Sequence, residues 1–210
     1  MEKFDFGPVS LLLTIPSSVY LPSDDTEMLA QAAQSQVPPG SSVLEIGTGS
    51  GAVILSLAKS GKKFKQLVAV DLNPDAVETA KKNAKENEID SKSVSFLQSD
   101  LFSSLPASSK FDFILFNPPY LPTSKLDKVK GALNSALDGG PDGLKTVRPF
   151  LAEAGKHLAP GGNILLVVSS LQPKDKLQAL LARHPFSHSV LLSKSFFFEK
   201  LEIWELSQKA

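Results

Sequence analysis

The stretch best suited to chemistry is the tetrad Asn117-Pro118-Pro119-Tyr120, which directly follows the apolar run Phe111–Phe116. The run predicts a buried strand, and ligands of open α/β sheets bind at the carboxyl ends of strands. Two consecutive prolines fix the backbone and remove two N–H donors, so nearby carbonyl oxygens are free to accept hydrogen bonds. The Asn117 side-chain oxygen and the Pro118 carbonyl can accept both hydrogens of an –NH2 group, and the Tyr120 ring can stack on a planar amide or base. Taken alone, the tetrad is more typical of a tight turn that ends a strand.

A glycine loop is the second candidate feature. Gly47, Gly49 and Gly51 lie between an expected strand and an expected helix. Glycine lets the backbone approach a ligand closely, and the helix N-terminus offers free N–H donors. The string from Gly47 to Ala52 also satisfies the dinucleotide-binding fingerprint with alanine in the last place, so the loop alone does not choose between cofactors.

Three carboxylates at the ends of three neighbouring strands favour S-adenosylmethionine over a dinucleotide such as NAD. Glu45 lies two residues before the first glycine, where an anion repels a pyrophosphate and attracts a ligand that carries an ammonium and a sulfonium. Asp71 can accept hydrogen bonds from ribose hydroxyls, and Asp100 from an adenine amino group. Each carboxylate alone is equally well explained as a helix cap or a solvated loop residue, whereas three together beside the glycine loop are not.

The tetrad and this cofactor together predict how a methyl group would be transferred. An amide or exocyclic amine nitrogen attacks poorly because its lone pair is delocalised. Acceptors at Asn117 and Pro118 would orient the nitrogen toward the sulfonium methyl and stabilise the positive charge that develops on it. Such positioning contributes on the order of 7–11 kcal/mol. No side chain of the stretch is an evident general base, so we expect proton loss to water.

Apolar runs alternate with helical periodicity along the chain, which predicts an α/β fold with a doubly wound, mostly parallel, seven-stranded, Rossmann-like sheet. Two β-rich runs in succession at the end predict an antiparallel edge hairpin. We expect strands at 42–46, 67–71, 93–98, 111–116, 163–169, 189–193 and 196–206, and helices at 24–35, 52–59, from Pro74 onward, at 144–157 and at 173–184. The loop 121–143 is long by the usual lengths of connections, so we expect it to be functional.

Composition bounds the organisation and the partners. We expect one domain over 1–210, in which an irregular flap and first helix (1–35) cover the cofactor site and 36–210 form the core sheet. The 22 basic and 22 acidic residues balance, so no overall basic field attracts nucleic acid. The absence of cysteine excludes disulfides and thiolate zinc sites. The three histidines are not spaced as metal ligands, and no membrane or signal segment is visible, so a cytoplasmic location is expected.

With these residues in hand, the chain resembles the HemK-type glutamine methyltransferases that modify peptide-chain release factors, in particular the short branch without an N-terminal helical domain. The glycine loop is generic to class I methyltransferases, and the tetrad is shared by several amino-methylating groups. The N-terminal segment 19–26 and a second glycine loop, Gly139-Gly-Pro-Asp-Gly143, are more discriminating. The matching segments are 19–26, 44–51, 71–74, 116–120 and 139–143.

The resemblance implies a reaction and a set of site residues. The reaction is N5-methylation of the glutamine in a release factor's Gly-Gly-Gln loop, with the target amide held by Asn117, Pro118, Pro119 and Tyr120. One departure is Leu21, where the short branch usually has Glu, which affects the rim of the substrate entrance. The expected cofactor contacts are Thr26, Glu45, Gly47, Gly49, Gly51, Asp71, Asp100, the Leu101 backbone and Asn117.

The short branch also commonly works with a small zinc-binding activator that pairs along the exposed third strand. Here that strand is 93–98, in which Val94, Phe96 and Leu97 could form an apolar edge. An edge covered by the chain's own residues is the alternative.

Three other functions compete with glutamine methylation. The first is amino methylation of a nucleobase in RNA or DNA, which suits the same tetrad but lacks a basic patch interleaved with aromatic residues. The second is methylation of a lysine on another protein. The third is a non-catalytic, cofactor-binding scaffold, which would have no need of Asn117 and Tyr120.

Overall fold

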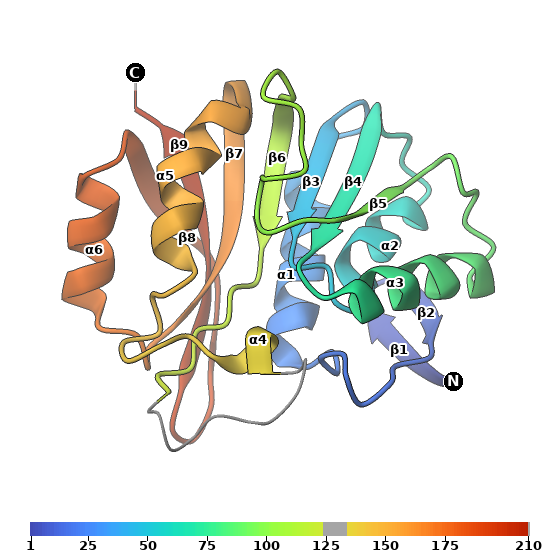
Figure 1. The fold of residues 1–210 in the computed structure, drawn as a ribbon, viewed down its shortest axis with the longest axis horizontal. Coiled ribbons are helices and arrows are strands. Elements are labelled where there is room, and N and C mark those ends of the chain that lie inside the picture. Colours follow the sequence, from blue (N-terminus) through green and yellow to red (C-terminus); the bar gives the residue numbers. More distant parts are fainter. Residues whose placement is uncertain (124–133, 210) are drawn as a thin grey trace.

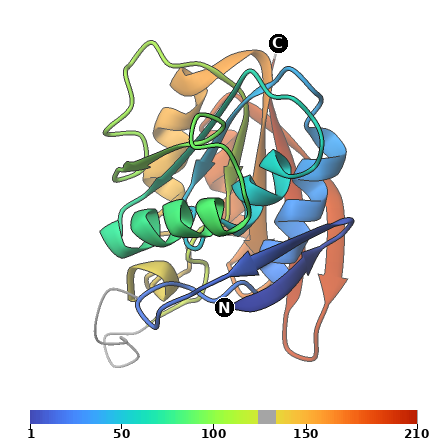
Figure 2. The ribbon, with the colours of Figure 1, turned by 90° about the vertical axis from the view of Figure 1, so that its right-hand side faces the viewer.

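Seven strands form one twisted sheet with helices on both faces (Figure 1, Figure 2). The computed structural model describes residues 1–123 and 134–209. The strand order is β5-β4-β3-β6-β7-β9-β8. The first five strands of this order pair in parallel, and β9 pairs antiparallel with both β7 and β8. The strands are β3 (Ser42–Ile46), β4 (Gln66–Asp71), β5 (Ser95–Gln98), β6 (Phe111–Phe116), β7 (Leu158–Ser169), β8 (Phe186–Ser195) and β9 (Lys200–Gln208). The predicted mostly parallel sheet with a C-terminal antiparallel hairpin is confirmed.

Side chains alternate between the two faces and so build two separate cores. On β7, Leu165 and Val167 belong to the core under α1 and α2, whereas Ile164 and Leu166 belong to the core under α5 and α6. Strands buried on both faces read as continuous apolar runs, as Phe111–Phe116 does. The helices are α1 (Asp24–Gln36), α2 (Ala52–Ala58), α3 (Pro74–Glu86), α4 (Asn134–Leu137), α5 (Val147–His157) and α6 (Lys174–Ala182).

The expected irregular flap at the N-terminus is in part a regular hairpin, and that expectation was wrong. Strands β1 (Glu2–Phe6) and β2 (Val9–Leu13) pair antiparallel and form a small second sheet. Alternate residues of the hairpin are buried against α1, α2 and α3. The prolines near the strand ends made this segment look irregular in the sequence. The backbone N–H of Leu12 donates to Asn87 Oδ1 at 2.9 Å, and this bond ties the hairpin to the end of α3.

Several boundaries differ from the predicted ones. Strand β5 begins at Ser95, and Val94 is buried at 4% exposure, so Val94 is not part of an open edge. Strand β7 begins at Leu158, before the predicted start at 163, and so includes the stretch Pro160-Gly-Gly162. The loop 121–143 contains the short helix α4, and its residues 124–133 lie outside the described part of the chain.

Two absences hold for residues 1–123 and 134–209. No helix there has the length and apolar character needed to cross a membrane. Within the same residues, no group of three or more His, Cys, Asp or Glu side chains is placed to hold a metal ion.

Candidate functional site

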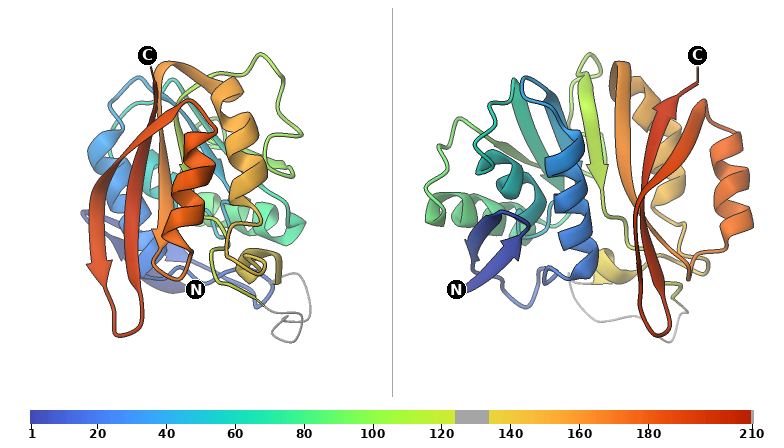
Figure 3. Two further views of the ribbon diagram at one scale, coloured as in Figure 1. Left: turned by 90° about the vertical axis from the view of Figure 1, so that its left-hand side faces the viewer. Right: turned by 180° about the vertical axis from the view of Figure 1, so that it is seen from behind.

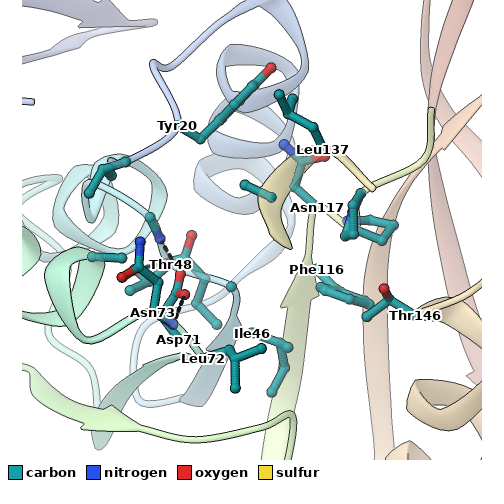
Figure 4. Close-up of a pocket in the computed structure, with 18 of the residues that line it drawn as sticks. Tyr20, Ile46, Thr48, Asp71, Leu72, Asn73, Phe116, Asn117, Leu137 and Thr146 are labelled. Atoms are coloured by element: carbon teal, nitrogen blue, oxygen red, sulfur yellow. Dashed lines mark hydrogen bonds between the residues drawn. The ribbon is translucent and has the colours of Figure 1, made fainter. Parts of the chain in front are cut away.

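A cavity of about 390 Å³ opens at the carboxyl ends of β3, β4 and β6 (Figure 4). The N-terminal segment before α1, the start of α1 and the end of α4 complete its wall. Eleven of the twelve predicted site residues line it, namely Thr26, Glu45, Gly47, Gly49, Asp71, Asp100, Leu101, Asn117, Pro118, Pro119 and Tyr120.

Gly51 is the predicted residue that does not line the cavity. It caps α2 with a φ of +84°. A Cβ at this position would lie 3.0 Å from the Ala80 Cβ and from Leu55 Cδ1. The glycine therefore allows α2 to begin close against α3, and its role is in packing.

The rest of the glycine loop presents its backbone to open space. Gly49 has a φ of +56°, and a Cβ there would meet nothing within 4 Å. The loop is anchored to β4, because the N–H groups of Gly47 and Thr48 donate to the Val70 carbonyl at 2.8 and 3.0 Å. A ligand in the cavity can thus approach this backbone without displacing protein atoms.

Glu45 is buried beneath the loop, at 3% exposure. Its Oε2 accepts hydrogen bonds from Thr48 Oγ1 at 2.6 Å and from the Ile54 N–H at 3.2 Å. Burial raises the pKa of Glu45 to about 8, and the charge of Asp71 acts in the same direction. The sequence suggested an anion here, but in the protein alone the neutral acid predominates at neutral pH. A cation in the cavity would restore the anion.

Asp71 and Asp100 stand at the next two strand ends. Asp71 accepts from the Gly49 N–H with Oδ2 at 2.9 Å and from the Asn73 N–H with Oδ1 at 2.8 Å, so it fixes the shape of the glycine loop. Burial raises the pKa of Asp71 above its usual value. Asp100 is exposed, and Leu101 follows it with a φ of +48°, a conformation that non-glycine residues rarely adopt. Such local strain is characteristic of functional sites.

Asn117 carries the clearest sign of a binding site. Within the described residues, its Oδ1 is a buried atom without a hydrogen-bond partner. An unpaired buried acceptor costs about 1–3 kcal/mol, so such atoms are rare unless a ligand satisfies them. Figure 4 shows Asn117 at the end of β6, across the cavity from the Asp71 side. The predicted amide acceptor is therefore buried, unpaired and beside the cavity.

Two residues that the sequence did not single out hold the aromatic part of the site. Asp25 is 2% exposed, and its Oδ2 accepts a hydrogen bond from Tyr20 and another from Tyr120, each at 3.1 Å. Its Oδ1 accepts from the N–H of Thr26 at 2.6 Å. The N-terminal segment and the start of α1 are thereby joined to the Asn-Pro-Pro-Tyr turn. In the sequence, the resemblance of segment 19–26 to the glutamine methyltransferases was the signal for this part of the site, and from it Thr26 alone was expected as a contact.

The second glycine loop packs directly behind the tetrad. A Cβ on Gly143, whose φ is +67°, would lie 2.2 Å from the Tyr120 carbonyl oxygen. The Gly139 N–H donates to the Leu121 carbonyl at 3.1 Å. Gln172 Nε2 donates to the Gly143 carbonyl at 2.7 Å and anchors the loop to the end of β7. This loop therefore sets the backbone position of the tetrad from outside the cavity.

Comparison with known proteins agrees with this geometry. The model of the methyltransferase small domain matches residues 23–195. The chain belongs to the methyltransferase small-domain family. A protein of Methanocaldococcus jannaschii assigned as an N5-glutamine methyltransferase is 42% identical over 159 residues, which are 76% of each chain. The release factor glutamine methyltransferase of Geobacter sulfurreducens is 34% identical over 72% of this chain, which spans 54% of that relative.

Solved structures support the same fold. In the Mtq2–Trm112 complex of E. cuniculi, described as responsible for methylation of the termination factor eRF1, the matching chain superposes with a TM-score of 0.69 at 23% identity. The match covers 92% of this chain and 99% of that one. The 16S rRNA N2 G1207 methyltransferase RsmC of T. thermophilus, solved with AdoMet and guanosine, superposes with a TM-score of 0.72 at 22% identity. It covers all of this chain and 50% of that protein. At these identities the likeness concerns the fold of this methyltransferase.

Proposed function

We propose that this methyltransferase transfers a methyl group from S-adenosylmethionine to the side-chain nitrogen of the glutamine in a release factor's Gly-Gly-Gln loop. The observation that carries the proposal is the buried, unpaired Asn117 Oδ1 at the cavity wall. The release factor glutamine methyltransferases at 32–36% identity, and the Methanocaldococcus relative, support the choice of substrate.

The cavity wall suits S-adenosylmethionine, which supplies an electrophilic methyl on a sulfonium. Open space above Gly49 leaves room for the cofactor to approach the loop backbone. Glu45 would face the cationic end of the cofactor, and Asp71 would face the ribose hydroxyls. Asp100 and the Leu101 backbone would face the adenine. Thr26 and the segment before α1 would cover the cofactor, because Asn73 Nδ2 donates to the Ser18 carbonyl at 2.9 Å and holds this segment over the cavity.

The chain's own part in the transfer is positioning. Asn117 Oδ1 and the Pro118 carbonyl would accept both hydrogens of the target amide, and this would aim the nitrogen lone pair at the methyl group. The two acceptors would also stabilise positive charge on the nitrogen as the bond forms. Asp25 would fix the Tyr120 ring against the flat amide. The surplus proton would leave to water.

The deciding experiment measures methyl transfer from labelled S-adenosylmethionine to a purified release factor and to a factor whose loop glutamine is replaced. Mass spectrometry locates the label. Label that disappears with that glutamine supports the proposal, and Asn117→Ala should lower kcat by roughly 10²–10³-fold. Label on a lysine, or on RNA supplied in parallel, would assign one of the competing substrates instead. Undiminished turnover by Asn117→Ala would refute the mechanism.

We also propose a small zinc-binding partner on β5, because the Mtq2-containing complex of E. cuniculi includes Trm112. Strand β5 lies at one edge of the sheet, and its residue Leu97 is 39% exposed. Purification of the native enzyme without a small zinc protein would contradict this partner.

A release factor acts at the ribosome, so we place the reaction in the cytoplasm.

A further inference from the structure

Two phenylalanines stand in solvent at the turn between β8 and β9. Phe197 is 91% exposed and Phe198 is 84% exposed, the highest exposures among the large apolar side chains of the described residues. Their rings pack edge to face with centroids 4.5 Å apart. We call this pair the aromatic tip. Exposed, paired aromatic rings are costly in water and mark contact surfaces.

The aromatic tip stands at the same end of the sheet as the cavity. Figure 3 shows the β8–β9 turn projecting beyond the rest of the ribbon, at the end where α4 lies. α4 lines the cavity with Ala136 and Leu137. Burial and the charge of Asp25 raise the pKa of both Tyr20 and Tyr120. The charge of Glu199, the next residue after the tip, acts in the same direction. The turn therefore carries a charge that acts on the tyrosines of the candidate site.

The hairpin that carries the tip is fixed to the site and does not hang free. Lys194 Nζ lies 2.5 Å from Asp24 Oδ1, at the residue that precedes the tyrosine-binding Asp25. The Phe196 N–H donates to the Glu199 carbonyl at 2.6 Å and closes the turn. Ser169 Oγ donates to Glu199 Oε1 at 2.5 Å, at the end of β7. A rigidly held tip loses little conformational freedom on binding.

We propose that the aromatic tip is a docking anchor for the protein substrate, received in an apolar recess beside the target loop. This inference rests on the proposed function. A glutamine that reaches the cavity brings its surrounding protein against the end of the sheet from which the tip projects. Three further exposed leucines border the same end, Leu21 and Leu121 beside the cavity tyrosines and Leu171 after β7. The contact thus continues from the cavity mouth to the tip.

The area of the aromatic tip favours the protein substrate as its partner over a second copy of the chain. An aromatic side chain buries about 150–250 Å², so the pair buries roughly 300–500 Å². A stable interface buries about 800 Å² on each partner. The tip alone is therefore too small for a dimer, whereas it suffices as the central anchor of a contact whose other part is the occupied cavity. Buried aromatic anchors dominate the energy of such contacts.

The test compares two substrates and two double variants. The substrates are an intact release factor and a short peptide that spans its Gly-Gly-Gln loop. Phe197→Ala with Phe198→Ala removes the tip, and Val190→Ala with Leu192→Ala removes exposed apolar side chains from β8 as the matched control. For the tip variant we expect KM for the intact factor to rise by roughly 10–100-fold, with kcat for the peptide unchanged. S-adenosylmethionine affinity and the thermal midpoint should stay at wild-type values, which shows an intact fold.

Each outcome separates the two proposals. An unchanged KM for the intact factor overturns the docking anchor while the proposed function stands. An equal loss on the peptide also overturns it, because the tip would then act on the cavity. If wild-type enzyme labels neither substrate, the proposed function fails and the docking inference falls with it. Recovery of most of the lost affinity by Phe197→Leu with Phe198→Leu supports an apolar contact.

Discussion

Tyr120 donates its hydroxyl hydrogen to Asp25 at 3.1 Å, across 95 positions of the chain. The same carboxylate oxygen accepts from Tyr20, so one buried side chain joins the N-terminal segment to the Asn-Pro-Pro-Tyr turn. Burial, followed by the charge of Asp25, raises the pKa of both tyrosines, so both stay protonated donors at neutral pH. The geometry of the Asn-Pro-Pro-Tyr turn, the proposed substrate acceptor, therefore depends on a residue at the start of α1.

Replacement of Asp25 should uncouple the two halves of the site. In Asp25→Ala two half-buried tyrosine hydroxyls lose their acceptor, and each costs at most about 1–3 kcal/mol, the range for a fully buried unpaired group. We expect a lower urea midpoint and at least a tenfold lower kcat, because the Tyr120 ring is no longer fixed. Tyr20→Phe is the matched control, since it removes one hydroxyl and leaves the Asp25–Tyr120 bond. A kcat in Asp25→Ala equal to that of Tyr20→Phe would show that the bond does not position Tyr120.

The contrast between Asp25 and Asn117 shows where sequence reasoning succeeds. Asn117 follows a continuous apolar run, so its place at a strand end could be predicted from local pattern alone. The partners of Asp25 come from two segments far apart in the chain, and nothing local indicates that their side chains meet. Parallel sheets bring strand ends together by rule, whereas contacts between loops depend on packing that no periodicity encodes.

The same limit applies to the N-terminal hairpin and to Gly51 of the glycine loop. The β1–β2 hairpin is stable because its apolar face is covered by three helices, and prolines at the ends of its strands hid the alternation. Gly51 follows the expected strand–loop–helix pattern, but its distance to Ala80 makes it a packing residue. The pattern placed the residue correctly and could not say which neighbour it meets.

Cofactor binding should release a proton from Glu45. The pKa of Glu45 is raised to about 8 by burial, so the side chain is mostly protonated at pH 7. A cationic ligand beside it favours the anion, and the released proton goes to the buffer. Titration calorimetry at pH 7 in buffers of different ionisation enthalpy should show release of up to about one proton in wild type. Glu45→Gln should show none, and equal release by both proteins would place the titrating group elsewhere.

Glu45 should also make the protein without cofactor less stable as the pH rises. Its folded pKa of about 8 lies above the ordinary glutamate value of 4.5, so between these values the native state binds more protons than the unfolded state. The free energy of unfolding then falls with rising pH, by up to about 1.4 kcal/mol per unit for one group. Denaturant unfolding of wild type from pH 5 to 8 should show this slope. Glu45→Gln should flatten it, and an unchanged slope in that variant would contradict the assignment.

A methyl group at Gly143 should disturb the tetrad through its backbone. The Cβ would lie 2.2 Å from the Tyr120 carbonyl oxygen, and the φ of +67° adds strain for any L residue. Gly161 offers a matched control, because its φ is +77° while a Cβ there would meet nothing within 4 Å. Gly161→Ala should therefore cost only the strain of a left-handed backbone, about 1–2 kcal/mol.

Gly143→Ala must in addition separate the new methyl group from the Tyr120 carbonyl, and we expect the Tyr120 backbone to shift from its place beside Asp25. We expect a larger loss of stability in urea unfolding than for Gly161→Ala, and a fall in kcat that the control does not share. S-adenosylmethionine affinity should change little, because the glycine loop beside β3 and β4 is not displaced. Equal effects of the two variants on kcat would mean that the second glycine loop does not set the position of the tetrad.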